Sequence, residues 1–304
     1  MPDIQAIDGV SGADVQAVNG VGVADIQAIN GLGVPSSSGA TRIVAAFDDA
    51  YVSWVNVADV ADGTVWENNA YQTRSNDTWD LTEIAYGKDG SGNPFYVAVV
   101  NSNNPEIIHD DDADITDGQQ WTEINLGGSN QPVGNLKQRT VEWGNNVWVT
   151  AGMLTSSNKY IYRSTDGSSW TAVDISGLTD IGNVYTNGIY ALTQDGAGKW
   201  WFGVGGKLYY SSDNASSWSL HATFSGETIQ DLVYTNNTLV ALVKSGGNPH
   251  LRAAASSDTT DFSSLVQLED SNSDGLNGNN AKRMAAGAGR VVVRDTARTL
   301  AADV

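Results

Sequence analysis

Two short stretches of the chain decide its fold: Ser164-Thr165-Asp166-Gly167-Ser168-Ser169-Trp170 and Ser211-Ser212-Asp213-Asn214-Ala215-Ser216-Ser217-Trp218. In each, a Ser stands two residues before an Asp, small residues follow, and a Trp ends the stretch. An Asp in this setting accepts hydrogen bonds from the backbone N–H groups just after it, and these bonds hold a tight turn. The Trp can then fold under the turn and pack in the core. Both stretches therefore predict a turn between two strands.

Weaker copies of this turn recur along the chain. A third copy contains Ser256, Asp258 and Phe262, a fourth contains Asp117 and Trp121, and the weakest ends at Trp79. The closing aromatic residues are 42, 49, 48 and 44 residues apart. Before each turn we expect three strands, because these runs are rich in β-branched and aromatic residues. The predicted strands are 42–47, 51–57 and 70–74; 84–87, 95–100 and 106–110; 140–144, 147–151 and 160–164; 190–194, 199–204 and 207–211; and 229–234, 238–243 and 251–256.

The repeated turns resemble the Asp-box (BNR) repeat of sialidase-like proteins. The resemblance implies an all-β fold, a β-propeller over residues 41–304, with six blades expected and five or seven as alternatives. It also implies that the repeated residues stabilise turns and take no part in catalysis. These structural residues are Ser164, Asp166, Trp170, Ser211, Asp213, Trp218, Ser256, Asp258, Phe262, Asp117, Trp121 and Trp79.

The C-terminal segment carries three further predicted strands, 282–286, 290–294 and 298–303, and stops where a further turn would begin. We expect a strand from the N-terminal side, near residues 34–41, to complete this sheet and close the ring. The alternative for residues 35–40, Pro-Ser-Ser-Ser-Gly-Ala, is a flexible linker.

Residues 1–34 contain a different repeat, whose copies begin at Asp3, Asp14 and Asp25, a period of 11 residues. Each copy has two apolar residues three apart and then an Asn-Gly or Asp-Gly step. The spacing predicts one helical turn per copy, capped by the Asp and ended by the Gly. A unit this small cannot bury its own apolar face, so we interpret residues 1–34 as a docking or oligomerisation segment. The alternative is a low-complexity tail.

The composition excludes several classes of function. The net charge is −19, which disfavours binding to nucleic acid and to anionic membranes. The chain has no Cys, so disulfides and thiolate zinc sites are excluded. No apolar run approaches the roughly 20 residues of a membrane-spanning helix. The first residues, Met-Pro-Asp-Ile-Gln, do not have the pattern of a secretory signal peptide.

The resemblance to sialidases raises the question of catalysis. Such enzymes carry an arginine triad, and the first arginine lies in an aromatic-Arg-Ile-Pro stretch. Here Thr41-Arg42-Ile43-Val44 stands in that region without the aromatic residue or the Pro. His109, His221 and His250 are scattered without metal-ligand spacing, and we expect them in loops or at strand ends. We therefore predict that the chain is not an enzyme and assign no catalytic or cofactor-binding residue.

One loop has the composition of a calcium site. Asp270, Asn272 and Asp274 alternate and are followed by Gly275, which is typical of the start of a calcium loop, although no Glu follows at the twelfth position. Residues 110–114 form a second acidic cluster. The alternative for both segments is a solvated polar loop. Calcium is the only cofactor that the sequence suggests.

An acidic chain with a short N-terminal repeat and a propeller of this kind is similar to virion proteins of tailed phages. The resemblance implies a tail or head fibre or a decoration protein at the virion surface, assembled in the host cytoplasm. Residues 1–34 would bind other virion proteins or a second copy, and the propeller would face outward and bind a host-surface glycan or receptor through loops such as 101–104, 154–158 and 245–249. The alternatives are a glycan-active hydrolase of sialidase-like fold and a host-encoded propeller that acts as an assembly scaffold.

Overall fold

The structure is a computed structural model of the 304-residue chain. It describes side chains in residues 81–100, 107–110, 121–126, 138–152, 159–179, 181, 188–195, 198–235, 237–245, 284, 291 and 293. It describes the backbone alone in the remaining strand residues, which are 4–7, 10–15, 28–29, 32–33, 42–46, 51–56, 71–72, 248–255, 264–266, 283, 285–287, 290, 292, 294 and 299–303. All the elements in the described residues are β-strands.

Four consecutive antiparallel sheets of four strands form the best-described part of the molecule. The first contains β8 (Leu81–Lys88), β9 (Pro94–Val100), β10 (Ile107–Asp110) and β11 (Thr122–Ile124). The second contains β12 (Gln138–Gly144), β13 (Val147–Gly152), β14 (Tyr160–Ser164) and β15 (Thr171–Asp174). The third contains β16 (Ala191–Gln194), β17 (Trp200–Val204), β18 (Lys207–Ser211) and β19 (Ser219–Thr223). The fourth contains β20 (Glu227–Thr235), β21 (Thr238–Ser245), β22 (Asn248–Ala255) and β23 (Ser264–Val266).

Two further sheets complete the arrangement. One pairs β3 (Ala28–Ile29), β4 (Leu32–Gly33), β5 (Arg42–Ala46), β6 (Tyr51–Asn56) and β7 (Tyr71–Gln72) in that order. The other pairs β24 (Arg283–Gly287), β25 (Arg290–Arg294) and β26 (Thr299–Asp303). A separate two-stranded sheet contains β1 (Ile4–Ile7) and β2 (Val10–Val15).

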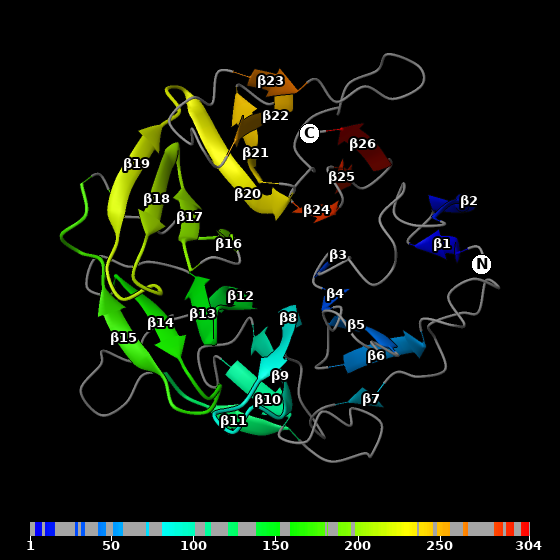
Figure 1. Ribbon diagram of the computed structural model, residues 1–304, viewed down its shortest axis with the longest axis vertical. Coiled ribbons are helices and arrows are strands. Elements are labelled where there is room, and N and C mark those ends of the chain that lie inside the picture. Colours follow the sequence, from blue (N-terminus) through cyan, green and yellow to red (C-terminus); the bar gives the residue numbers. More distant parts are fainter. Residues whose placement is uncertain are drawn as a thin grey trace.

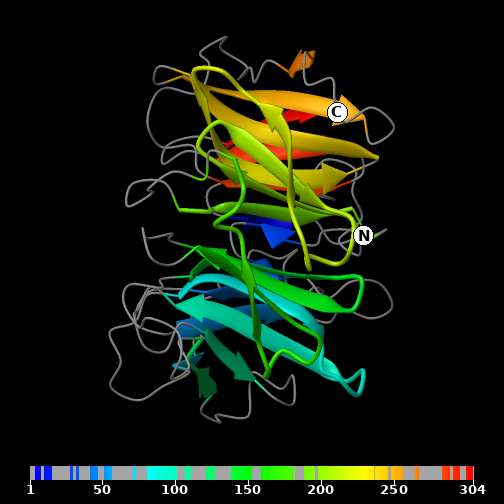
Figure 2. The same cartoon turned by 90° about the vertical axis from the view of Figure 1, so that its left-hand side faces the viewer.

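Apart from the separate β1–β2 sheet, the sheets are arranged around a common centre, with the first strand of each sheet innermost (Figure 1). Each inner strand contacts the inner strand of the next sheet, in the order β8, β12, β16, β20 and β24. β24 contacts β3, and β4 and β5 contact β8, so the ring of contacts is closed. From the side, successive sheets lie face to face (Figure 2). This confirms the predicted all-β architecture, while the count of six blades stays a prediction.

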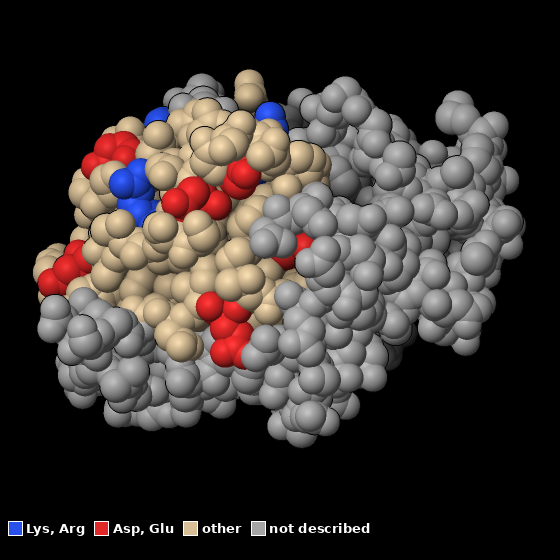
Figure 3. Space-filling model, turned by 90° about the horizontal axis from the view of Figure 1, so that it is seen from below, with Lys and Arg blue, Asp and Glu red and all other residues tan. Residues whose placement is uncertain are grey.

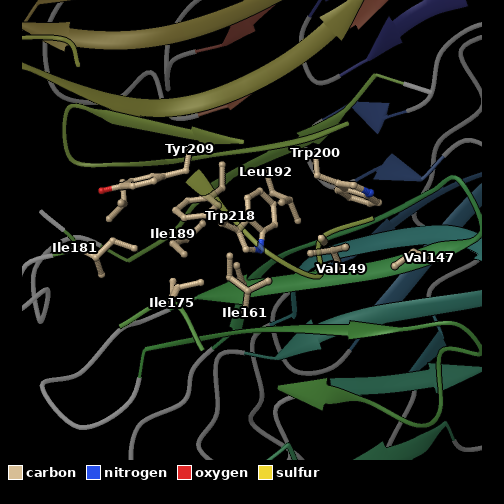
Figure 4. Packing of buried hydrophobic residues seen from close by; sticks show 14 residues of the cluster. Val147, Val149, Ile161, Ile175, Ile181, Ile189, Leu192, Trp200, Tyr209 and Trp218 are labelled. Atoms are coloured by element: carbon tan, nitrogen blue, oxygen red, sulfur yellow. The ribbon is translucent and has the colours of Figure 1, made fainter. Parts of the chain in front are cut away.

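The core lies between adjacent sheets, which explains why the second strands are apolar almost throughout. In β9, for example, Phe95, Val97 and Val99 pack toward Trp148 of the next sheet, whereas Tyr96, Ala98 and Val100 pack on the opposite face. The same holds between the second and third sheets, where Val149 and Ile161 meet Trp200 and Phe202 (Figure 4). A strand buried on both faces has no reason to alternate apolar with polar residues. Each sheet is therefore held by two interfaces.

The predicted strands agree closely with the observed ones. Residues 160–164, 207–211 and 290–294 match observed strands residue for residue. Three strand starts were missed: β8 begins at Leu81 and β22 at Asn248, each three residues before the prediction, and β12 begins at Gln138. Two of these, β8 and β12, are inner strands. Both strands contain an irregularity in their pairing near the start, between Leu81 and Glu83 and between Gln138 and Thr140. An extra residue there breaks the alternation that reveals a strand in the sequence.

Two predictions about particular segments are wrong. The first apolar pair of the N-terminal repeat, Ile4 and Ile7, lies in strand β1 and not in a helical turn, because the Asp-Gly step after it separates two paired strands and not a helix from a loop. The predicted contact loop 245–249 is largely strand, since Ser245 pairs with Asn248 and Lys244 with Pro249. The predicted contact loops 101–104 and 154–158, the linker or closing strand 35–40, and the whole closing segment 34–41 lie outside the described residues.

Candidate functional site

The first turn that decided the fold, Ser164–Trp170, is held by hydrogen bonds within its own residues. Asp166 Oδ1 accepts bonds from the backbone N–H groups of Ser168 at 2.9 Å and Ser169 at 2.7 Å, and from the Ser164 hydroxyl at 2.9 Å. Ser164 Oγ in turn accepts from the N–H of Gly167 at 2.8 Å. Burial alone would raise the pKa of Asp166, but the bonds from Ser169, Ser164 and Ser168 together lower it to about 2. The carboxylate is thus an acceptor for the turn that contains it.

The second turn, Ser211–Trp218, uses the same bonds with one extra residue. Asp213 Oδ1 accepts from the N–H groups of Ser216 at 3.1 Å and Ser217 at 2.9 Å, and from the Ser211 hydroxyl at 2.7 Å. Ser211 Oγ accepts from the N–H of Ala215 at 2.9 Å. Burial again favours a higher pKa for Asp213, and the bonds from Ser217, Ser211 and Ser216 reverse it, so the pKa is lowered. We call these two segments the serine–aspartate turns.

The closing aromatic residues that the structure describes, Trp121, Trp170 and Trp218, pack into or against the core, as expected. Trp218 is buried and meets Phe202 edge to face, with ring centroids 4.8 Å apart. Trp170 is half-buried and its Nε1 donates to the Gly167 carbonyl at 2.9 Å. Trp121, the closing residue of the fourth predicted copy, is buried among Leu81, Ile84 and Tyr96. These aromatic side chains are therefore structural.

The end of the sheets that carries the serine–aspartate turns also joins neighbouring sheets. The Asn145 side chain, in the β12–β13 loop, donates to Asn214 Oδ1 of the second serine–aspartate turn at 2.6 Å. Trp148 Nε1 donates to the carbonyl of Lys88 in the preceding sheet at 2.8 Å. A third aspartate turn, which sequence reasoning missed, lies between β8 and β9, where Asp89 Oδ1 accepts from the N–H groups of Ser91 and Asn93. Its signal is the Asp-Gly-Ser-Gly-Asn sequence between two strands.

A second group of carboxylates, which the sequence did not single out, lies on the inner strands. Glu83 of β8 accepts a bond from the Val141 N–H of β12 at 2.9 Å. Asp231 of β20 accepts from the Met284 N–H of β24 at 2.6 Å. Both residues directly follow the pairing irregularity of their strand. Each carboxylate therefore links its own inner strand to the next one.

Glu142 of β12 is the third of these axial carboxylates, a name we use for Glu83, Glu142 and Asp231. It accepts hydrogen bonds from the Gln194 backbone and the Thr193 side chain. Its Oε2 atom is buried and has no hydrogen-bond partner among the described residues, although the whole side chain is only partly buried. Burial raises its pKa well above the ordinary value, and the nearby charges of Glu83 and Asp231 raise it further. Glu142 therefore binds a proton more tightly than an exposed Glu.

The opposite end of the inner strands carries an exposed aromatic residue. Tyr190, just before β16, is 38% exposed, and the guanidinium of Arg139 lies 5.9 Å from its ring centroid. Arg139 stands at the start of β12, where the pairing is irregular. A tyrosine ring with a guanidinium over it offers both a stacking surface and a positive charge. This pair was not predicted, because neither residue belongs to a recognisable motif.

Other predicted residues divide into those the structure describes and those it does not. His109 lies in β10, buried and stacked on Phe95. His221 lies within β19 and not at its end, and its ring packs against those of Trp201 and Tyr210. Asp110 of the acidic cluster is buried at the end of β10 and not solvated. The predicted residues that lie outside the described part are Trp79, Asp117, Ser256, Asp258, Phe262, Asp270, Asn272 and Asp274.

The described part of the chain contains no group of three or more His, Asp or Glu side chains placed to hold a metal ion. It also contains no helix that is long and apolar enough to cross a membrane. The surface in Figure 3 shows Asp and Glu side chains spread over the described residues with fewer Lys and Arg among them, in keeping with the net charge of −19.

Comparison with known proteins identifies the fold. No family model matches the chain, and no curated protein matches it. Solved structures do. The extracellular domain of a one-component system of B. thetaiotaomicron superposes with a TM-score of 0.57 at 12% identity, covering 87% of this chain and 31% of that one. PorZ, a surface component of the type-IX secretion system of Porphyromonas gingivalis, gives 0.55 at 14% identity, covering 88% of this chain and 38% of that one.

The chain is a β-propeller. A GH74 enzyme of Niastella koreensis shares the fold with a TM-score of 0.53 at 17% identity, covering 86% of this chain and 35% of that one. The propeller thus spans about a third of the length of these three bacterial proteins. At such identities the likeness extends to the fold alone.

Proposed function

We propose that the propeller is a non-catalytic structural protein of a tailed-phage virion, a fibre or decoration protein whose ring faces outward and binds a host-surface glycan. The observation that carries the non-catalytic part is the use of the motif residues. Asp166 and Asp213 accept hydrogen bonds from the backbone of their own turns, while Trp218 is buried and the half-buried Trp170 packs against the core. The residues that repeat most clearly in the sequence therefore hold the ring together.

The glycan-binding part is supported by Tyr190 and Arg139. An exposed tyrosine ring stacks on the apolar face of a sugar, and a guanidinium pairs with a sugar carboxylate. Because these residues precede or begin inner strands, they lie at the end of the ring opposite the serine–aspartate turns. A rigid scaffold that presents such a pair at one end suits recognition.

The glycan test uses a matched control. Tyr190 and Leu220 are both 38% exposed, but Leu220 lies on β19 at the outer edge of its sheet. We expect the wild-type chain to bind a subset of acidic glycans on an array, Tyr190→Ala to lose that binding about tenfold or more, and Leu220→Ala to retain it. No binding by the wild-type chain, or equal loss in both variants, would contradict this part of the proposal.

The virion part is tested separately. An antibody against the propeller should label the surface of intact particles in electron micrographs, because the ring is proposed to face outward. Labelling restricted to material released from lysed host cells would overturn the virion assignment and leave the glycan result unaffected.

A glycan-active hydrolase is the second candidate, and the axial carboxylates are the observation that favours it. A protonated Glu beside ionised carboxylates is a common acid–base arrangement in glycosidases. Glu83 and Asp231, however, accept bonds from neighbouring backbone N–H groups, which is a structural use. Hydrolysis of fluorogenic glycosides that disappears in Glu142→Gln would favour this candidate, and we expect no hydrolysis by the wild-type chain.

A further inference from the structure

The N-terminal repeat folds in a way that its sequence did not predict. In the first copy, Ile7 pairs with Val10 and Ala6 with Ser11. In the third copy, Ile29 pairs with Leu32 and Ala28 with Gly33. Each residue of the second set is 22 positions after its counterpart, which is two periods of 11. The two copies therefore form the same antiparallel pairing.

The turn dipeptides of the repeat explain this register. Asp8-Gly9 stands between the paired residues Ile7 and Val10, and Asn30-Gly31 stands between Ile29 and Leu32. Asp-Gly and Asn-Gly between two paired residues form the strongest short signal for a hairpin. Successive dipeptides are separated by nine residues, 10–18 and 21–29. One strand of up to nine residues plus a two-residue turn thus accounts for the period of 11.

The two ends of the repeat have different surroundings. The third copy is joined to the ring, because β4 pairs with β5 through Gly33 and Val44 and β3 contacts β24. The first copy forms a sheet of only two strands, β1 and β2, among the described strands. A two-stranded hairpin is marginally stable in water by itself, and its outer edge presents unpaired backbone groups.

The pairing of β1 with β2 shows which kind of strand can pair with the edge of β1. Ile4 pairs with Val15, and these two residues occupy the same position in successive copies of the repeat. A strand of the repeat therefore accepts another strand of the repeat as its antiparallel partner, with one pair of equivalent residues, Ile4 and Val15, opposite each other before the register shifts. We propose that the free edge of β1 pairs with the repeat of a second copy of this chain, so that the propellers associate by strand addition.

The charge of the repeat determines how this association depends on salt. Residues 1–34 contain four Asp and no Lys, Arg or Glu. Two such segments repel each other at low ionic strength, and salt screens the repulsion. Self-association by β1 should therefore strengthen as salt is added, whereas binding of a basic partner at the same edge would weaken. The inference rests on the register of the repeat and is independent of glycan binding.

The experiment measures the mass of the full chain by light scattering after size exclusion, at low and high salt. Ile4→Pro and Gln5→Pro each remove one N–H of β1, and because successive N–H groups of a strand point to opposite sides, one of them faces the free edge. Ser37→Pro, outside the repeat, is the matched control. We expect at least twice the monomer mass for the wild type and the control, a larger associated fraction at high salt, and the monomer mass for at least one β1 variant.

Circular dichroism shows whether each variant keeps the all-β fold. A wild-type chain that stays monomeric at high concentration and high salt would overturn the proposal. Association that persists in both β1 variants would also overturn it, and so would association that salt weakens, because that result indicates contact between opposite charges.

Discussion

The serine–aspartate turns and the axial carboxylates place the same chemical group in opposite situations. Asp166 accepts three hydrogen bonds on one oxygen at the surface of the ring, and its pKa falls to about 2. Glu142 lies among the inner strands beside Glu83 and Asp231, and its pKa is raised well above 4.5 by burial and by their charge. Folding therefore favours the ionised form of Asp166, whereas it disfavours the ionised form of Glu142.

This difference shows how the propeller distributes stability. The turns contribute at neutral pH, because their carboxylates are ionised and satisfied. At Glu142, among the inner strands, ionisation opposes folding, because a buried carboxylate oxygen has no partner among the described residues.

Gly167→Ala should have the largest effect on the first serine–aspartate turn. Gly167 has φ of 77°, and a Cβ added there would lie 2.4 Å from the Phe95 ring of the preceding sheet. The strained backbone and the overlap together should destabilise the protein by about 2–4 kcal/mol. Urea denaturation measures the loss. Gly177→Ala, where an added Cβ meets nothing within 4 Å, is the control and should change little.

Asp166→Ala should cost about 1–2 kcal/mol, because the N–H groups of Ser168 and Ser169 lose their acceptor in a half-exposed turn. The loss has a defined pH range. Because the pKa of Asp166 falls from 3.8 to about 2 on folding, its contribution is present above about pH 4 and disappears as pH falls toward 2. Wild type and variant should therefore differ at pH 6 and converge near pH 2 in thermal unfolding. A difference that stays constant with pH would contradict the role of the charge.

The sequence predicted the parts of this structure that depend on local chemistry. The serine–aspartate turns were recognised because every bond in them joins residues within a few positions of each other. The strands were located because apolar β-branched and aromatic residues fill both faces of the second strands, such as β9, β13 and β17. The fold follows from repeating these two features.

The axial carboxylates and the Arg139–Tyr190 pair could not be predicted in the same way. Glu83 meets Val141 across 58 positions, and Asp231 meets Met284 across 53, so only the packing of neighbouring sheets brings them together. The structure of the N-terminal repeat was predicted wrongly for a different reason. Its apolar residues three apart fit one helical turn and also fit strands that flank a turn, and the Asp-Gly step decides between them.

Glu142→Gln tests the axis and should raise stability by a small amount at neutral pH. The raised pKa means that the folded chain holds a proton that the unfolded chain releases, so stability falls as pH rises above about 4.5. Gln removes this dependence and can still accept one bond at its carbonyl oxygen. Its midpoint of thermal unfolding should exceed that of the wild type by a few degrees at pH 8 and match it near pH 4. A variant that is less stable at pH 8 would show that the charge of Glu142 is needed.

Ala215→Gly compares the two serine–aspartate turns directly and should have the smallest effect on the free energy of unfolding. Ala215 has φ of 61°, where glycine is less strained, and this favours the variant by about 1 kcal/mol. Its methyl group is fully buried in the core beside Trp218, and losing it costs a similar amount, about 0.8 kcal/mol. The two effects should cancel to within about 0.5 kcal/mol in urea denaturation, unlike the reverse change at Gly167. A loss above 2 kcal/mol would mean that the methyl contact outweighs the backbone strain, and that the longer turn depends on packing where the shorter one depends on glycine.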